Sequence, residues 1–219
     1  GYPVLIKAAH GGGGKGIAVV EQPGQLEQMF IRMSKEALNA FGNGDLYLEK
    51  FIRSLRHLEV QVLRDFQGNS HLLGIRDCSV QRNYQKLIEE SAFDLPQKIQ
   101  DQLFKYSRKL IDEIDYVGAG TVEFIYDLGE QKIYFMEMNT RLQVEHPVSE
   151  MVTGVDLVNQ QFSVAEGKSL ENLEIRTHGH AMELRINAER VDLDSSGFLR
   201  FVPDPGRVTE AYFPAEEKI

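Results

Sequence analysis

The sequence predicts an α+β fold built mainly from antiparallel sheets. Several segments alternate apolar and polar residues, as strands with one buried face do. Short turns such as residues 67–69 join neighbouring segments, which favours hairpins over parallel crossovers. Helical spacing of apolar residues occurs in a few longer segments that interrupt the strands, and we find no internal repeat.

The first part of the chain reads as a small sheet with one helix. Residues 4–8 form a buried strand ending in a basic residue, and residues 17–21 form a short strand after a glycine-rich turn at 10–16. Pro23 and Gly24 open a helix that runs to about Phe41 and places its apolar residues near 3.6 spacing. These apolar residues are Leu26, Met29, Phe30, Met33 and Leu38.

The remaining elements follow from the same two periodicities. Strands are expected at residues 46–52, 56–64, 71–75, 121–126, 132–139 and 180–188, and helices at about 96–114 and 155–166. Pro96 starts the first of these helices and Gly167 ends the second. We place a boundary near Gln85, between a part with the glycine turn and one small sheet and a part with an acidic hairpin and a second sheet.

Composition excludes several classes of protein. Hydrophobic residues make up 42% and charged residues 26% of the 219 residues, which is ordinary for a globular protein. The net charge of −9 gives no basic face for nucleic acid, and no apolar run approaches the roughly 18 residues of a membrane helix. The single cysteine, Cys78, cannot form an internal disulfide, which fits a reducing compartment.

A glycine run at residues 11–14 points to phosphate binding. Four consecutive glycines remove every Cβ that would keep backbone amides from phosphate oxygens, and Lys7 and Lys15 flank them with positive charge. The run fits neither the Walker nor the dinucleotide pattern, because a strand-like segment follows it rather than a helix. The alternative is a flexible surface turn.

A polar run after the acidic hairpin is the second candidate site. If the chain is extended here, one face carries Glu137, Asn139, Arg141, Gln143 and Glu145. Glu123, in the preceding strand, would lie across the hairpin from Glu137, and two close carboxylates with an amide oxygen suit Mg²⁺. Arg141 would then be a donor for a small anion and Glu145 a general base. A solvated strand face is the alternative.

Three other features are less specific. Residues 57–62 alternate polar and apolar side chains, and residues 76–86 form a dense polar segment that could equally be a solvated loop. Cys78 is interpreted as a packing residue, since no partner base is indicated. Arg185 alternates with apolar neighbours, and a structural salt bridge is the alternative to a functional role.

Six segments together resemble biotin carboxylases, the ATP-grasp components of acetyl-CoA, propionyl-CoA, methylcrotonyl-CoA and pyruvate carboxylases. The most specific is Glu137–Pro147, and the resemblance extends from the first residues to about Gly206. The other segments are residues 6–14, 56–62, 76–82, 118–124 and 185–189. The resemblance implies a small lid sheet (1–85), a central catalytic part (86–190) and the start of a C-terminal region (191–219).

The resemblance also implies a reaction and its participants. ATP with Mg²⁺ or Mn²⁺ phosphorylates bicarbonate, the carboxyphosphate releases CO₂, and CO₂ carboxylates biotin on a carrier protein. A carboxyltransferase then uses the carboxybiotin, and the full-length enzymes form homodimers. Bacterial cytoplasm and the mitochondrial matrix both fit.

Roles for individual residues are carried over from the family's motifs. ATP contacts are implied for Lys7, Gly12, Gly13, Gly14, Lys15, Glu49, Lys50, Ile52, His57, Gln81 and Tyr84. The bicarbonate pocket is implied for Lys86, Arg141, Gln143 and Val144, and the metal site for Glu123, Glu137 and Asn139. Glu145 resembles the base that deprotonates bicarbonate, and Arg185 the arginine that stabilises the biotin enolate, so the implied catalytic set is Glu145, Arg141, Arg185 and Lys86.

Two departures from the family pattern and two rival functions accompany this interpretation. Tyr84 stands where the family usually has His, and His10 replaces a small residue at the start of the glycine turn. Another bicarbonate-phosphorylating ATP-grasp enzyme, of the carbamoyl phosphate synthetase kind, is the first rival. A non-catalytic nucleotide-binding fragment is the second, because the family has further regions before and after the matched part, and we expect weak or absent turnover by this chain alone.

Overall fold

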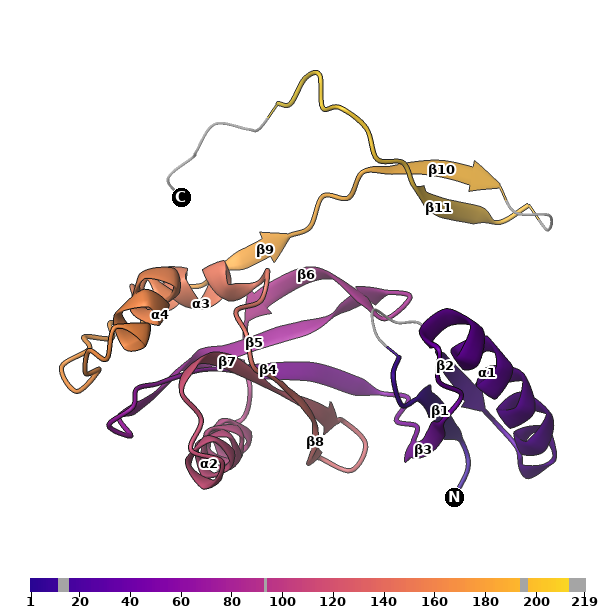
Figure 1. Ribbon diagram of the computed structural model, residues 1–219, viewed down its shortest axis with the longest axis horizontal. Coiled ribbons are helices and arrows are strands. Elements are labelled where there is room, and N and C mark those ends of the chain that lie inside the picture. The colour runs from indigo at the N-terminus through magenta and orange to yellow at the C-terminus, as the bar shows by residue number, and fades with distance from the viewer. Residues whose placement is uncertain (12–15, 93, 194–196, 213–219) are drawn as a thin grey trace. The chain divides into compact units, whose positions relative to one another are not determined.

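The computed structural model describes residues 1–11, 16–92, 94–193 and 197–212 (Figure 1). It divides into two compact units, Gly1–Leu184 and Arg185–Ile219, which are described separately below. In the described part of the chain, no helix combines the length and the hydropathy needed to cross a bilayer.

The chain begins with a three-stranded antiparallel sheet covered by one helix (Figure 1). The strands β1 (Val4–Ala8), β2 (Ile17–Val20) and β3 (Leu46–Lys50) lie in the order β2-β1-β3. A short 3-10 turn precedes α1 (Leu26–Phe41), whose Met33 packs with Ile6 and Val20. Gly42, with a φ of 76°, ends α1 and donates its N–H to the Leu38 carbonyl. These predicted elements are therefore confirmed.

A six-stranded antiparallel sheet forms the larger part of the first unit. Its order is β8-β7-β4-β5-β6-β9, so that β4 and β5 lie at the centre. The strands are β4 (Leu55–Arg64), β5 (Ser70–Arg82), β6 (Gln85–Ser91), β7 (Gly118–Asp127), β8 (Lys132–Asn139) and β9 (Met182–Leu184).

The two faces of this sheet have opposite character. Leu58, Val60 and Val62 of β4 pack against α2 (Gln97–Glu113) in the main apolar core. The alternating residues His57, Glu59 and Gln61 therefore point to the other face, yet they are also buried. Helix α3 (His146–Thr153) lies on this polar face, opposite α2 (Figure 1). Polar side chains enclosed in this way must bond to one another.

Several boundaries differ from the sequence prediction. Strand β5 continues through residues 76–82, and β6 follows after a two-residue turn, so the dense polar segment is a hairpin, buried at residues 76–78 and exposed at its turn, and not a loop. Strand β8 ends at Asn139, so residues 140–145 are not extended. Helix α3 was not predicted; Pro147 in its first turn favours its start. Only residues 182–184 of the predicted late strand are paired with β6.

The predicted helix at 155–166 is confirmed as α4 (Leu157–Ala165). Asp156 caps it by accepting the Asn159 N–H at 2.8 Å. The change from the small to the large sheet lies between β3 and β4, and not near Gln85, because β4 and β5 pair within the sheet that also holds β6 and β7. In the second unit, β10 (Glu189–Leu193) and β11 (Leu199–Pro203) form an antiparallel hairpin.

Candidate active site

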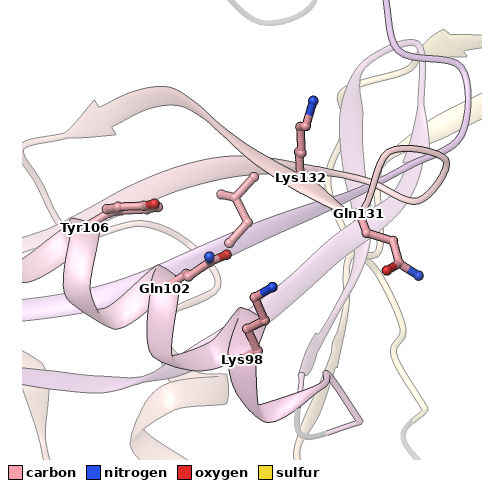
Figure 2. Close-up of a pocket in the computed structure, with 6 residues that line it drawn as sticks. Lys98, Gln102, Tyr106, Gln131 and Lys132 are labelled. Carbon is pink, nitrogen blue, oxygen red and sulfur yellow. The ribbon is translucent and has the colours of Figure 1, made fainter.

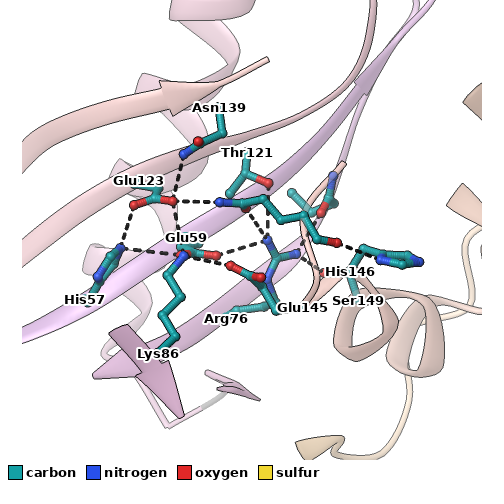
Figure 3. Close-up of polar contacts among 12 residues, drawn as sticks. His57, Glu59, Arg76, Lys86, Thr121, Glu123, Asn139, Glu145, His146 and Ser149 are labelled. Atoms are coloured by element: carbon teal, nitrogen blue, oxygen red, sulfur yellow. Dashed lines mark hydrogen bonds and ion pairs between the residues drawn. The ribbon is translucent and has the colours of Figure 1, made fainter. Parts of the chain in front are cut away.

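A cluster of ionisable and amide side chains fills the polar face of the large sheet (Figure 3). Strands β4, β5, β6 and β7, the loop after β8 and helix α3 all contribute to it. We call it the polar cluster; its members are His57, Glu59, Gln61, Arg76, Lys86, Thr121, Glu123, Gln143, Glu145 and Ser149.

Lys86 is the meeting point of three carboxylates. Its Nζ lies 2.7 Å from Glu145 Oε1 and 3.2 Å from Glu123 Oε1, and it also pairs with Glu59. Burial alone would lower the pKa of Lys86, but the negative charges of Glu59 and Glu123 outweigh it and hold that pKa above its ordinary value. The ammonium group is therefore a fixed positive charge at neutral pH.

Glu123 is ionised for related reasons. Burial would raise its pKa, but the hydrogen bond from His57 at 2.9 Å and the charge of Lys86 lower the pKa of Glu123 to about 2. Gln143 Nε2 and Asn139 Nδ2 each donate to its Oε1 at 2.8 Å. Glu145 behaves in the same way: burial would raise its pKa, and Lys86 lowers it. All three groups thus keep their charges inside the protein.

The residues predicted to bind a metal lie at the outer edge of this cluster. Glu137 is directly opposite Glu123 in the β7–β8 pairing, as predicted from the hairpin. Asn139 Nδ2 lies 2.8 Å from Glu123 Oε1 and 3.3 Å from Glu137 Oε1, so one amide bridges the two carboxylates. Glu137 is exposed, and two carboxylates with an amide that can turn its oxygen inward suit a hard divalent cation.

A cation deeper in the cluster is a poorer fit. His57, Glu59 and Glu123 do offer ligand atoms within 4.8 Å of one another. However, the Lys86 ammonium group already lies against both of these carboxylates, and a metal ion there would face its charge. The donor set around Glu137 therefore fits Mg²⁺ or Mn²⁺ better than the interior does.

The predicted bicarbonate residues divide into two groups. Lys86 and Gln143 belong to the polar cluster, where Gln143 is only 7% exposed. Arg141 is exposed, and its guanidinium donates to the Leu142 carbonyl at 3.2 Å. Val144 is 62% exposed. The predicted common face of alternate residues was wrong beyond Asn139, because the chain turns, yet Gln143 and Glu145 still reach Glu123 and Lys86.

Four of the predicted nucleotide residues lie in the small sheet or directly after its last strand, β3. Lys7 and Glu49, on neighbouring strands, form an ion pair at 3.2 Å. Lys50 bonds to Glu130 at 2.6 Å and Ile52 is buried. Gly12, Gly13, Gly14 and Lys15 lie outside the described residues.

The other predicted nucleotide contacts lie near the polar cluster. Gln81 bonds to His57 Nδ1 at 2.8 Å, which fixes the ring that holds Glu123. Tyr84 is 52% exposed in the two-residue turn between β5 and β6, where both Asn83 and Tyr84 have positive φ. Arg185 is the first residue of the second unit.

Sequence reasoning missed Glu59, Gln61, Arg76, Thr121 and Ser149 as site residues. Glu59 is fully buried and bonds to both Arg76 and Lys86. The signal for Glu59 was present, because it alternates between His57 and Gln61. Ser149 had no such signal, because it reaches the cluster only through the orientation of α3.

A separate surface pocket, of about 270 Å³, lies between α2 and the start of β8 (Figure 2). Its six lining residues contain two lysines and no carboxylate: Lys98, Gln102, Tyr106, Gln131, Lys132 and Ile133. It lies on the α2 side of the sheet and shares no residue with the polar cluster, so it is not the candidate site.

Cys78 is expected to be unreactive in the folded protein. It is fully buried beside the cluster, and burial together with the nearby charge of Glu59 raises the pKa of its thiol far above the ordinary value. Ellman's reagent should therefore release no thiolate signal from the native chain at pH 8 and one equivalent in guanidinium chloride. A full native reaction within minutes would contradict this burial.

Comparison with known proteins places the chain in a family. The family model described as the carbamoyl-phosphate synthase L chain, ATP binding domain, matches residues 1–173. The chain belongs to this family. Within the family it is similar to "Biotin carboxylase 1" of Bacillus subtilis (strain 168), with 49% identity over 217 residues, covering 98% of this chain and 47% of the relative. The chain thus spans about half the length of the curated relatives it matches.

Solved structures agree in fold. A Campylobacter jejuni biotin carboxylase, solved as a β,γ-ATP complex, matches with a TM-score of 0.88 and 48% identity over 99% of this chain and 47% of that one. The biotin carboxylase domain dimer of Hydrogenobacter thermophilus 2-oxoglutarate carboxylase, solved with MgADP, ADP and bicarbonate, matches with a TM-score of 0.81 and 43% identity over 89% of this chain and 47% of that one. The α+β fold of this family member is therefore the ATP-grasp fold of biotin carboxylases.

Proposed function

We propose that this chain is the ATP- and bicarbonate-binding core of a biotin carboxylase, an ATP-dependent carbon–nitrogen ligase. The observation that carries the proposal is the polar cluster itself, in which Lys86, Glu123, Gln143 and Glu145 come together from distant parts of the sequence. The biotin carboxylase relatives, crystallised with ATP-type nucleotides and with bicarbonate, support the choice of ligands.

Bound Mg²⁺ would supply charge neutralisation for the transferred phosphoryl group. Glu137, Glu123 and Asn139 would hold it at the edge of the cluster. Lys7 and the glycine run, with Lys15, would lie against the nucleotide phosphates, and Glu49, Lys50 and Ile52 against the base. His57, Gln81 and Tyr84 would complete the nucleotide side.

Lys86 and Glu145 suggest how bicarbonate would be activated. In the free protein Lys86 bonds to Glu145 at 2.7 Å, which keeps that carboxylate ionised but a weak base. A bicarbonate oxygen that accepts a hydrogen bond from the Lys86 ammonium group would compete with Glu145 for that group. The pKa of Glu145 would then rise, so that the same carboxylate becomes a better proton acceptor as the substrate enters.

Arg141, Gln143 and Val144 would complete the bicarbonate pocket, and Arg185 would act on biotin. Biotin would arrive on a carrier protein or domain, with a carboxyltransferase and a homodimeric arrangement in the whole enzyme. Because the chain spans about half of its relatives, we propose that turnover by the chain alone is weak. A carbamoyl-phosphate-forming activity is the second candidate, on the description of the matching family; dependence of turnover on biotin separates the two.

Calorimetric titration with Mg·ATP tests the nucleotide side of the proposal. The chain is expected to bind Mg·ATP, and Glu137→Gln should weaken binding by about tenfold or more, because it replaces a carboxylate ligand of the metal with an amide. Affinity for ATP measured in EDTA should change little in the same variant.

Glu113→Gln is the matched control, since Glu113 is exposed at the end of α2 and lies on the opposite face of the sheet. Equal affinities of Glu137→Gln and the parent chain at every Mg²⁺ concentration would rule out the metal site. A parent chain that binds no nucleotide would count against the proposed function as a whole.

A further inference from the structure

Arg76 is the most completely enclosed cation in the described structure. It lies on β5 directly opposite Glu59 of β4, and its side chain is 1% exposed. An arginine keeps its proton at every accessible pH, so its charge cannot be removed by burial. Such a group is retained only where several acceptors surround it.

The guanidinium group of Arg76 contacts oxygens from four separate segments (Figure 3). Nη1 donates to Gln61 Oε1 at 2.7 Å and to Ser149 Oγ at 2.8 Å. Nη2 donates to Glu59 Oε2 at 3.1 Å, to Thr121 Oγ1 at 3.2 Å and to Gln143 Oε1 at 3.4 Å. It therefore joins β4, β7, the loop after β8 and helix α3.

These contacts fix the direction of two amide groups. A guanidinium group only donates, so the amide end that faces it must be the oxygen. For Gln143 this leaves Nε2 as the end that donates to Glu123 at 2.8 Å. For Gln61 it leaves Nε2 to donate to the Gly120 carbonyl at 2.9 Å. Arg76 thus holds the oxygen end of Gln143, while Glu123, which only accepts, holds its nitrogen end, so the two contacts favour the same orientation.

Arg76 also holds one side of the carboxylate that contacts Lys86. Glu59 gives one oxygen to Arg76 and the other to Lys86. Without Arg76, one oxygen of Glu59 would lose its partner, and both oxygens could then turn toward the Lys86 ammonium group. The position of the proposed bicarbonate donor consequently depends on a residue that does not touch it.

We propose that Arg76 is a positioning residue for the bicarbonate side of the site, acting through the amide of Gln143 and the carboxylate of Glu59. The proposal rests on the proposed function, because bicarbonate is the ligand assigned to this side. It predicts that changes at Arg76 affect bicarbonate and leave Mg·ATP nearly unaffected, since none of the five hydrogen-bond partners given above is a proposed metal or nucleotide residue.

The test compares Arg76→Lys with the parent chain in three measurements. Bicarbonate affinity is followed by broadening of the ¹³C resonance of labelled bicarbonate, and Mg·ATP affinity by calorimetry. The side-chain NH₂ signal of Gln143, identified by its absence in Gln143→Glu, reports the amide orientation. Lysine keeps the charge but not the fork of donors, so bicarbonate affinity should fall about tenfold or more, with less than about a twofold change for Mg·ATP.

Arg64→Lys is the matched control. Arg64 lies on the same strand as Glu59, has a side chain that is 11% exposed, and donates to the Tyr116 carbonyl at 2.9 Å, away from the cluster. It should leave all three readouts unchanged. If Arg76→Lys does not fold, the same measurements are made on the double variant Arg76→Met with Glu59→Gln. This variant removes both charges together and so leaves neither of them unpaired in the interior.

Each outcome decides the proposal. An unchanged Gln143 signal with unchanged bicarbonate affinity overturns it, as does an equal loss of affinity for both ligands, which would indicate a general structural role. If the parent chain binds no bicarbonate, the proposed function fails on this side, and the Gln143 signal alone decides whether Arg76 positions that amide.

Discussion

Replacing Lys86 with methionine is expected to lower the free energy of unfolding by about 3–5 kcal/mol, because it leaves buried carboxylates without their shared cation. Glu59, Glu123 and Glu145 all contact its Nζ, and each is less than 5% exposed. Arg76 does not take the place of Lys86, since it bonds to the Glu59 oxygen that Lys86 does not contact. The measurement is urea unfolding at pH 7, and the same variant should lose bicarbonate binding.

Lys105→Met is the control for this prediction. Lys105 is exposed on α2, so its loss should change stability by less than about 0.5 kcal/mol. Lys86→Arg keeps the charge and should retain more of the stability than Lys86→Met. A loss of under about 1 kcal/mol in Lys86→Met would mean that the three carboxylates do not depend on Lys86 for their burial.

Replacing Asp65 with alanine is expected to cost about 3 kcal/mol, because several backbone and side-chain donors lose their acceptor in a buried place. Asp65 is fully buried at the end of β4 and accepts from Gln67 N, Asn69 N, Asn69 Nδ2 and Leu170 N at 2.9, 2.8, 2.8 and 2.7 Å. The Leu170 contact joins the β4–β5 turn to the chain after α4. Thermal unfolding at pH 7 measures the loss, and Asp65→Asn, which keeps the shape, should lose less.

The same residue predicts a pH dependence. Burial would raise the pKa of Asp65, but the hydrogen bonds from Leu170 and Asn69 outweigh it and lower that pKa below its ordinary value. A lowered folded-state pKa means that the stabilisation is complete above the unfolded pKa, near 4, and is lost as the pH falls through the folded value. Asp65→Asn should therefore lose less stability than the parent chain between pH 5 and pH 2. Parallel curves for the two proteins would contradict this.

The sequence-based prediction succeeded where the pattern was local. The β7–β8 hairpin and the pairing of Glu123 with Glu137 follow from alternation and one short turn, and the structure has both. The end of α1 at Phe41 was likewise predicted, and it follows from the adjacent Gly42. Information of this kind lies within a few residues of the feature it determines.

The prediction failed where burial depends on distant partners. On sequence alone residues 76–82 could equally be a solvated loop, because most of them are polar, but Nη1 and Nη2 of Arg76 donate to buried oxygens, one of which lies 73 residues away in the chain. Helix α3 is short and directly follows a polar run that reads as extended. Neither feature can be inferred until the sheet order is known, because the partners are specified by topology and not by spacing.

The contrast between the two faces of β4 has a consequence for how the chain avoids misfolding. A slip of one residue in strand pairing turns every side chain to the opposite face, so the register is strongly specified wherever one face is buried. In β4 a slip would bring His57, Glu59 and Gln61 against the apolar side of α2. It would also place Leu58 and Val60 among the charged side chains of the polar cluster. The slipped pairing is unfavourable on both faces, and it costs roughly 2–7 kcal/mol for each polar group buried without a partner. The residues that line the proposed anion site therefore also disfavour incorrect pairing of the strands.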